Sequence, residues 1–557
     1  MITLKNQNII STLKGVRGMF FVAILFLFQS ALAQKFTRAD TLIGSITPER
    51  AWWDVTHYDL KVTVNPSQKT IKGSNTISYK VLEPNNIMQI DLQTPMKIDK
   101  ILQDGKEITY TSEGNAHFLK LQKKQIKGSE NNITIYFSGK PTEAVRPPWD
   151  GGFTWTKDSN GKPFIATSNQ GIGSSVWWPL KDHPSEEPDN GVTIAVTTPK
   201  DLMDVSNGRL IKVSETDSTK TWTWQVVNPI NAYGVDINIG DYVHWGEKYK
   251  GEKGMLDMDY YVLRENEAKA KEQFKQAPKM MEAFEHWFGP YPFYEDGYKL
   301  VEAPYLGMEH QSSVTYGNKF KNGYLGRDLS GTGWGLKFDF IIIHESGHEW
   351  FANNITNKDV ADMWIHEGFT NYSENLYLDY FFGKKASSEY VVGIRKNILN
   401  DRPIIGEYNV DNPGSSDMYY KGANILHTLR QLVDNDEKWR NILRGLNKEF
   451  YHQTVTTKQV EEYISKESGI DLTAFFDQYL RTTMVPKVEY SLADGNSLKF
   501  RYVDIIENFD MPIIAVVNGK EEWIYPTSEW KTKKFPAAIE TVEIKKDFYV
   551  NSEEIKR

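Results

Sequence analysis

The amino-acid sequence predicts a multidomain α+β protein in which a mainly helical part lies between two β-rich parts. The chain has 557 residues, more than a single hydrophobic core usually supports. Apolar and polar residues alternate in short runs from about residue 51 to 245, helical periodicity dominates from about 247 to 485, and alternation then returns. We therefore expect an all-β domain over residues 34–245, a helical domain over 246–485 and a β domain over 486–557.

The first 33 residues have the pattern of a signal peptide for export. They carry three basic residues and no acidic one, followed by the apolar run Met19–Phe28 and the small residues Ala31-Leu32-Ala33 before Gln34. The apolar run is too short to span a bilayer comfortably, and no later stretch is apolar enough. We expect a periplasmic or secreted protein without stable membrane association after cleavage; an uncleaved anchor is the alternative.

Composition excludes several classes of function. The chain has no cysteine, which rules out disulfides, thiol nucleophiles and thiolate zinc sites. Its formal net charge is −8, and signal removal would make it more negative by three. Nucleic acid is therefore not an expected partner.

Strand-like alternation marks both β domains. In the first domain it runs through Tyr58, Leu60, Val62 and Val64; Met88, Ile90 and Leu92; and Ile133, Ile135 and Phe137. In the last domain it runs through Leu498, Phe500 and Tyr502. Asn518-Gly519 is a typical two-residue hairpin turn between residues 515–517 and 523–525.

In the helical domain, the segment His344-Glu345-Ser346-Gly347-His348 follows the apolar run Phe340–Ile343. Residues four apart share a helix face, so both histidines can bind one metal ion. Glu345 lies beside that face, where its carboxylate can take a proton from metal-bound water without becoming a ligand. The alternative is a chance pentapeptide on a buried helix.

A second helix is predicted from Trp364 to a stop at Gly383, and it supplies the carboxylate of Glu367. Two imidazoles, one carboxylate and one open position make a catalytic zinc site. Glu374 lies seven residues further on the same face, where it could accept a hydrogen bond from a ligand histidine; an exposed carboxylate is the alternative. His366 lies about 100° away from Glu367 and is expected to pack or to meet solvent.

His344, Glu345 and His348, followed after an eighteen-residue gap by Glu367, make the chain resemble the aminopeptidase N family of zinc metallopeptidases, which includes leukotriene hydrolase. The resemblance implies one zinc ion per chain. It also implies a β saddle, a thermolysin-like catalytic domain and a small C-terminal β sandwich. The large C-terminal helical domain of many relatives has no room here.

The family has a Gly-x-Met-Glu-Asn segment before the zinc helix, and Gly307-Met308-Glu309-His310 stands in its place. The resemblance implies that Gly307, Met308 and Glu309 bind substrate, with Glu309 holding the free α-amino group; His310, where the family has Asn, is left unassigned. An exopeptidase needs such a carboxylate, because a blocked N-terminus would leave it buried and unpaired at a cost of about 3–5 kcal/mol. A surface carboxylate is the alternative for Glu309.

Two further residues are assigned by resemblance. Gln170, before Trp177-Trp178-Pro179, corresponds to the Gln or Glu that joins the amine site, although a glycine-rich loop amide is the alternative. Tyr419 falls at the tyrosine that donates to the oxyanion, where such a donor contributes about 2.7–4 kcal/mol. Spacing alone does not separate Tyr419 from Tyr420.

We therefore expect an exported zinc aminopeptidase that hydrolyses peptides with a free N-terminus. A zinc hydrolase of a non-peptide substrate, such as an epoxide, would keep the same ligands. A non-catalytic binding protein on the same fold would be expected to lack Glu345 or the oxyanion tyrosine, and both are present. Resemblance of fold alone does not choose among these functions.

Overall fold

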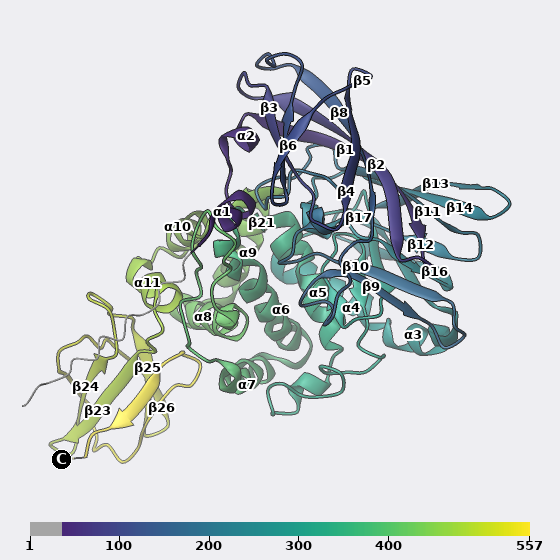
Figure 1. Cartoon of the computed structure of the whole chain (residues 1–557). Helices are drawn as coiled ribbons and strands as arrows, with labels where there is room; N and C mark the ends of the chain where they lie inside the picture. The colour runs from purple at the N-terminus through teal and green to yellow at the C-terminus, as the bar shows by residue number, and fades with distance from the viewer. Residues whose placement is uncertain (1–35, 557) are drawn as a thin grey trace, which may run out of the picture.

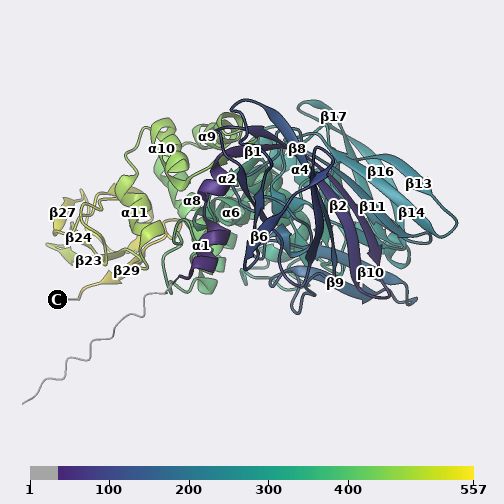
Figure 2. The same ribbon diagram turned by 45° about the horizontal axis from the view of Figure 1, so that its top comes forward.

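The computed structural model describes residues 36–556, which form three regions in a row (Figure 1). A large β region lies at one end, helices fill the middle, and two small sheets lie at the other end; Figure 2 shows the same order from a second direction. This arrangement confirms the predicted multidomain α+β fold. The boundaries at residues 245 and 485 stay predictions, and the predicted signal peptide lies outside the described residues.

The N-terminal region begins with helices α1 (Arg38–Gly44) and α2 (Pro48–Ala51) and continues as three sheets. The largest has the strand order β13-β14-β11-β1-β2-β8-β4-β5 and consists of β1 (Trp53–Asn65), β2 (Thr70–Val81), β4 (Lys97–Gln103), β5 (Lys106–Glu107), β8 (Glu130–Gly139), β11 (Val192–Pro199), β13 (Arg209–Glu215) and β14 (Thr219–Val226). A four-stranded sheet, β12-β15-β10-β9, contains β9 (Gly152–Lys157), β10 (Pro163–Ser168), β12 (Met203–Val205) and β15 (Asn238–Gly240). The third sheet, β3-β7-β6, contains β3 (Ile87–Asp91), β6 (Tyr110–Glu113) and β7 (Ala116–Lys120).

The predicted alternation decides which face of these strands enters the core. On β1, Tyr58, Leu60, Val62 and Val64 are buried, and the residues between them are half-buried or exposed. Strand β1 pairs with β2 on one side and with β11 on the other. Each buried aliphatic side chain of this size contributes about 1.5–3 kcal/mol, so the pattern fixes the register of the central strands.

The middle region contains a five-stranded sheet that the sequence pattern did not indicate. Its order is β16-β17-β18-β20-β19, with β16 (Tyr242–Gly251), β17 (Gly254–Leu263), β18 (Tyr298–Glu302), β19 (Gly307–Met308) and β20 (Val314–Tyr316). Strands β19 and β20, of two and three residues, are too short to show an alternation, whereas the longer β17 does alternate at Leu256, Met258 and Tyr260 but lies in a part of the chain predicted as mainly helical. Strand β19 ends the sheet and pairs with β20 on one side, so its other edge is free to meet a ligand.

Nine α-helices fill the rest of the middle region, which confirms its mainly helical character. They are α3 (Glu267–Gln273), α4 (Gln276–Phe288), α5 (Phe340–Gly347), α6 (Trp364–Phe382), α7 (Lys384–Ile394), α8 (Tyr420–Val433), α9 (Asp436–Glu449), α10 (Thr457–Ser468) and α11 (Thr473–Arg481). A small parallel pair, β21 (Ile355–Asn357) and β22 (Gln453–Val455), lies among them. Helix α6 ends at Gly383, whose φ of 85° suits glycine, as the sequence predicted.

The C-terminal region consists of two small sheets whose core is continuous with that of the helices. One sheet, β27-β24-β23-β29, contains β23 (Lys487–Ala493), β24 (Ser497–Val503), β27 (Lys531–Lys534) and β29 (Asn551–Glu554). The other, β26-β25-β28, contains β25 (Ile513–Val517), β26 (Lys520–Ile524) and β28 (Val542–Ile544). The predicted hairpin at Asn518-Gly519 joins β25 to β26, and both turn residues have positive φ.

No helix within residues 36–556 is both long enough and apolar enough to cross a bilayer. The longest, α6, contains charged and amide side chains that lie inside the protein.

Candidate metal centre and active site

Helix α5 positions the first two predicted metal ligands. The Asp339 carboxylate accepts a hydrogen bond from the backbone N–H of Ile341 (3.1 Å) and so caps the helix. The apolar residues 341–343 are buried and hold the helix in the core. His344 lies in the last turn, and His348 follows the helix end with helical dihedral angles (φ −64°, ψ −19°). The two imidazole centroids are therefore only 5.1 Å apart.

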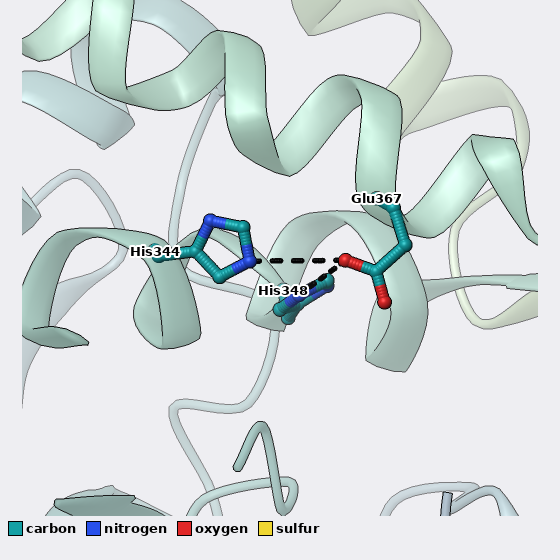
Figure 3. A group of neighbouring side chains, drawn as sticks. All are labelled: His344, His348 and Glu367. Atoms are coloured by element: carbon teal, nitrogen blue, oxygen red, sulfur yellow. Dashed lines mark ion pairs between the residues drawn. The ribbon is translucent and has the colours of Figure 1, made fainter. Parts of the chain in front are cut away.

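Glu367 comes from the first turn of α6, which packs against α5. Its Oε2 lies 3.7 Å from Nε2 of His344 and 3.4 Å from Nε2 of His348 (Figure 3). The three side chains are 5%, 1% and 1% exposed in the order His344, His348, Glu367. Their donor atoms lie within 4.8 Å of one another, so one ion can contact all three.

Each of the two histidines has a partner for its second ring nitrogen. Nδ1 of His344 donates to Oε1 of Glu374 (2.9 Å), and Nδ1 of His348 donates to the backbone carbonyl of Phe351 (3.0 Å). The backbone leaves helical geometry at Phe351, which allows its carbonyl to accept this bond. Because Nδ1 carries the proton in a neutral ring with such a partner, Nε2 of each ring is free to bind a metal.

The protonation of these imidazoles depends on the neighbouring carboxylates. Burial lowers the pKa of His344, but hydrogen bonds to Glu367 and Glu374 outweigh it and raise the pKa well above its usual range. Burial lowers the pKa of His348, but the charges of Glu367 and Glu309 and a hydrogen bond to Glu367 together outweigh it and raise the pKa. A metal binds only the neutral imidazole, so metal binding releases protons and strengthens as the pH rises.

The donor set fits zinc. Oε2 of Glu367 is buried and has no hydrogen-bond partner within the described residues, an unfavourable state that a cation between the three donors would relieve. Two imidazoles and a carboxylate with one open position are typical of catalytic zinc sites. Donors about 2.0–2.2 Å from a tetrahedral ion lie about 3.3–3.6 Å apart, close to the 3.4 and 3.7 Å found here.

Glu345 lies beside this site. A Cβ atom on residue 307 would come within 2.9 Å of Oε1 of Glu345, so Gly307 provides the space that the carboxylate occupies. Burial raises the pKa of Glu345 to about 7, against the opposing charge of His344. Atoms of Glu309, Glu345 and His348 also lie within 4.8 Å of one another. A carboxyl group with this pKa can accept and return a proton near neutral pH.

Glu309 is held by residues from both domains. Its side chain is 2% exposed, and its Oε1 accepts hydrogen bonds from Nε2 of Gln170 (2.8 Å) and Oη of Tyr233 (3.0 Å). Asn353 donates to the backbone carbonyl of Glu309 (2.8 Å). Nε2 of Gln170 also lies 3.0 Å from Oε1 of Glu367. One amide therefore connects the Glu309 carboxylate to a predicted metal ligand.

Tyr419 and Tyr420 lie at the start of α8 and differ in their surroundings. The Tyr419 ring is nearly parallel to that of His344, with centroids 6.0 Å apart and an angle of 18°. Burial raises the pKa of Tyr419, and the charge of Glu367 raises it further; burial also raises the pKa of Tyr420 to about 12, and there the added charge is that of Glu374. Glu374 contacts the Nδ1 side of His344, away from the metal-facing nitrogen. Both tyrosines line the active-site cavity, and Tyr419 is the one on which the charge of Glu367 acts.

Two neighbouring histidines have other surroundings. His310 is fully buried with Nδ1 3.2 Å from Oδ2 of Asp236. His366 is also buried, and its Nε2 accepts a hydrogen bond from the backbone N–H of Asn357 (2.7 Å). His366 therefore packs, as its position beside Glu367 on the helix led us to expect.

The structure brings nearly all the predicted site residues to one cavity of about 470 Å³. Its wall contains Gln170, Gly307, Met308, Glu309, His344, Glu345, His348, Glu367 and Tyr419. Glu374 lies outside the wall and reaches the site through His344. A cavity of this size accepts a small ligand or one end of a longer one.

Tyr233 is the contact that sequence reasoning missed. It lies in a short 3-10 turn, Ala232–Gly234, and comes 76 positions before Glu309 in the chain. With 29 tyrosines in the sequence and no motif around residue 233, nothing in the pattern distinguished it. Only the packing of the two domains brings its hydroxyl to the carboxylate.

His344 and His348 flank Glu345 in the sequence, and Glu367 from helix α6 completes the set of three metal ligands. This arrangement defines a zinc metallohydrolase. Comparison with family models gives the more specific assignment. The peptidase family M1 domain matches residues 272–479, and the peptidase M1 N-terminal domain matches residues 55–233. The chain belongs to peptidase family M1, and its cofactor is zinc, bound by His344, His348 and Glu367.

Curated relatives are distant in sequence. The chain is 21% identical over 482 residues to probable aminopeptidase 1 of Sulfurisphaera tokodaii, which covers 81% of this chain and 57% of the relative. It is 24% identical over 449 residues to leukotriene A-4 hydrolase of Xenopus laevis, covering 75% of this chain and 68% of the relative. The chain thus spans between about half and two thirds of the length of these relatives.

Solved structures share the fold. An M1 zinc metallopeptidase from Deinococcus radiodurans superposes with a TM-score of 0.65 at 20% identity, covering 80% of this chain and 98% of that one. The same protein has been solved with a Tyr-Ser-Ala substrate, and a two-domain M1 zinc metallopeptidase with L-tryptophan matches with a TM-score of 0.62. The similarity to both supports the arrangement of a β region followed by a helical catalytic region.

Proposed function

We propose that this chain is an exported zinc aminopeptidase that removes residues from the N-terminus of peptides. The observation that carries the proposal is the position of Glu309. Its buried carboxylate lies within 4.8 Å of Glu345 and His348, so an ammonium bound to Glu309 would hold the adjacent carbonyl beside the metal site. The amine and the first peptide carbonyl belong to one residue, which limits cleavage to the first bond.

Glu309 would select substrates by charge. A free α-amino group is protonated near neutral pH and pairs with the carboxylate, whereas an acylated amine leaves the carboxylate buried and unpaired. Gln170 and Tyr233 hold the carboxylate from one side. Because both are neutral donors, the charge of Glu309 stays available for the substrate.

The reaction would proceed through proton transfers by Glu345. Zinc, when bound, polarises the scissile carbonyl and lowers the pKa of water. Glu345 takes the proton from the attacking water, the new C–O bond forms at the carbonyl carbon, and the negative charge moves to the carbonyl oxygen. The Tyr419 hydroxyl donates to that oxygen. Glu345 then passes its proton to the leaving nitrogen as the C–N bond breaks, and an amino acid and a shortened peptide result.

Export is supported by the sequence of residues 1–33, with its basic start, apolar run and small residues before Gln34. We expect the mature protein in the periplasm or outside the cell. Determination of its N-terminal sequence tests this: a start at or near Gln34 supports export, and retention of Met1 in the cell argues against it.

The function is tested by a paired reporter assay. Leucine anilide and its N-acetylated form should differ in kcat/KM by at least about 100-fold, the equivalent of about 3 kcal/mol for an unpaired buried carboxylate. A chelator should abolish hydrolysis of the free-amine form, and added zinc should restore it. Equal rates on the two reporters would overturn the aminopeptidase assignment, and activity confined to a substrate without an amine would favour a non-peptide hydrolase.

A further inference from the structure

A second cavity of about 570 Å³ adjoins the active-site cavity. Trp149 and Leu306 contribute to the walls of both, so the two spaces meet at these residues. Much of the second wall is apolar or aromatic, including Pro147, Pro304, Tyr305, Phe320 and Leu325. The mechanism above uses none of this space.

The path of the substrate can be followed from strand β19. The proposed amine anchor, Glu309, follows the strand, and Leu306 precedes it. An extended peptide advances about 3.3 Å per residue, so its fourth residue lies about 10 Å from an amine held at Glu309. A peptide that pairs with the free edge of β19, with its amine at Glu309, would therefore bring its fourth residue to Leu306 and to the mouth of the second cavity.

Trp149 forms the wall opposite the catalytic domain. It lies on the N-terminal-domain loop between β8 and β9, and 67% of its side chain is exposed. The loop is held in shape, because Oδ2 of Asp150 accepts hydrogen bonds from the backbone N–H groups of Val145 (2.8 Å) and Arg146 (2.7 Å). The indole ring of Trp149 is therefore an exposed apolar surface, on a loop of defined shape, beside the two cavities.

We propose that the second cavity binds the part of the peptide that follows the scissile bond, and that Trp149 selects an aromatic or large apolar side chain at the fourth position. The inference rests on the proposed function, because it takes its direction from an amine at Glu309. Trp149 stacks against the substrate side chain, and Leu306 packs beside it. The preference therefore requires a peptide of at least four residues.

Competing pentapeptides test the proposal. Leu-Ala-Ala-Phe-Ala and Leu-Ala-Ala-Gly-Ala differ only at the fourth position, and release of the first leucine is measured for each. We expect kcat/KM for the phenylalanine peptide to exceed that for the glycine peptide about tenfold, from stacking and apolar burial. Trp149→Ala should reduce this ratio to about one, and Trp149→Phe should retain part of it.

Val145→Ala is the matched control. Val145 lies on the same loop, is 86% exposed and borders neither cavity, so its variant should keep the wild-type ratio. A ratio near one in the wild type, or a ratio that Trp149→Ala leaves unchanged, would overturn this inference alone if leucine anilide is hydrolysed. A wild-type enzyme that does not hydrolyse leucine anilide would overturn the proposed function as well.

Discussion

The metal side and the amine side of the cavity are built in different ways. His344, His348 and Glu367 come from two successive helices that pack directly against each other. Gln170 and Glu309 are 139 positions apart and belong to different regions of the fold. The comparison teaches that the metal chemistry depends on local helix geometry, whereas substrate orientation depends on how the N-terminal region is seated on the catalytic one.

Glu345→Gln is expected to give the largest effect on the metal side. The variant keeps the shape of the side chain but cannot accept a proton, so kcat should fall by about 10²–10⁴-fold. Zinc content should be unchanged, because Glu345 is outside the three-ligand set. Steady-state kinetics on leucine anilide and metal analysis of the same sample measure both quantities. A variant that loses zinc along with activity would assign Glu345 to the metal site instead.

The pH dependence of kcat/KM should also report the protonation of Glu345. Burial raises the pKa of Glu345 to about 7, and the charge of a bound cation would lower it from there. Because the base acts only when ionised, kcat/KM should rise with pH through a midpoint below 7 and decline as the pH falls under it. Zinc content measured across the same pH range distinguishes protonation of Glu345 from loss of the metal as the cause of the decline in kcat/KM. A profile that stays flat between pH 5 and 7 would contradict the assignment.

Glu309→Gln should give the largest effect on the amine side. Loss of the charge that pairs with the substrate ammonium should lower kcat/KM for leucine anilide by about 10²-fold or more. The N-acetylated reporter serves as the internal comparison, because its hydrolysis should not fall: a neutral Gln leaves no buried charge unpaired when the amine is blocked. The discrimination between the two reporters would then collapse, and a variant that still prefers the free amine would move the anchor elsewhere.

Glu374→Gln tests the hydrogen bond that holds the metal ligand His344 in place. Glu374 accepts hydrogen bonds from Nδ1 of His344 (2.9 Å), from Asn371 (2.8 Å) and from Tyr390. Removing its charge should weaken zinc binding by about 10–100-fold, as found for partners of ligand histidines. Competition with a chromophoric chelator measures the affinity. Glu389→Gln, on the exposed surface of α7, is the control and should leave zinc affinity unchanged.

Tyr233→Phe should give the smallest effect. It removes one of two side-chain donors to the Glu309 carboxylate, and a loss of about 1 kcal/mol corresponds to an approximately fivefold lower kcat/KM. Tyr380→Phe removes a similar bond from Tyr380 to Glu282 (2.8 Å) at the surface and should be silent. Equal activity of both variants and the wild type would show that Gln170 alone orients Glu309.

The sequence predicted the metal side well because its information is local. Helical periodicity links His344 to His348, and the same periodicity links Glu367 to Glu374 across two turns. On the amine side, Gln170 and Glu309 were predicted only from a family resemblance, and neither periodicity nor resemblance predicted Tyr233. Its contact depends on the docking of two regions, which no short spacing encodes.

The fold shows the same division. Long alternating strands such as β1 were predictable, since burial of every second residue leaves a clear period. Strand β19 has two residues and no period of its own, and only its pairing with β20 defines it. The sequence pattern therefore did not predict the edge of β19 that we expect to bind peptide, although the resemblance to the family motif assigned Gly307 and Met308 to substrate binding.

The double hydrogen bond of Gln170 has a consequence for assembly. Because one amide from the N-terminal region contacts both Glu309 and Glu367, any loosening of that region would remove a neighbour from a zinc ligand. The extent to which zinc is retained should therefore report how firmly the N-terminal region is bound to the catalytic region. Mild denaturant that separates them would then release zinc before the helices themselves melt.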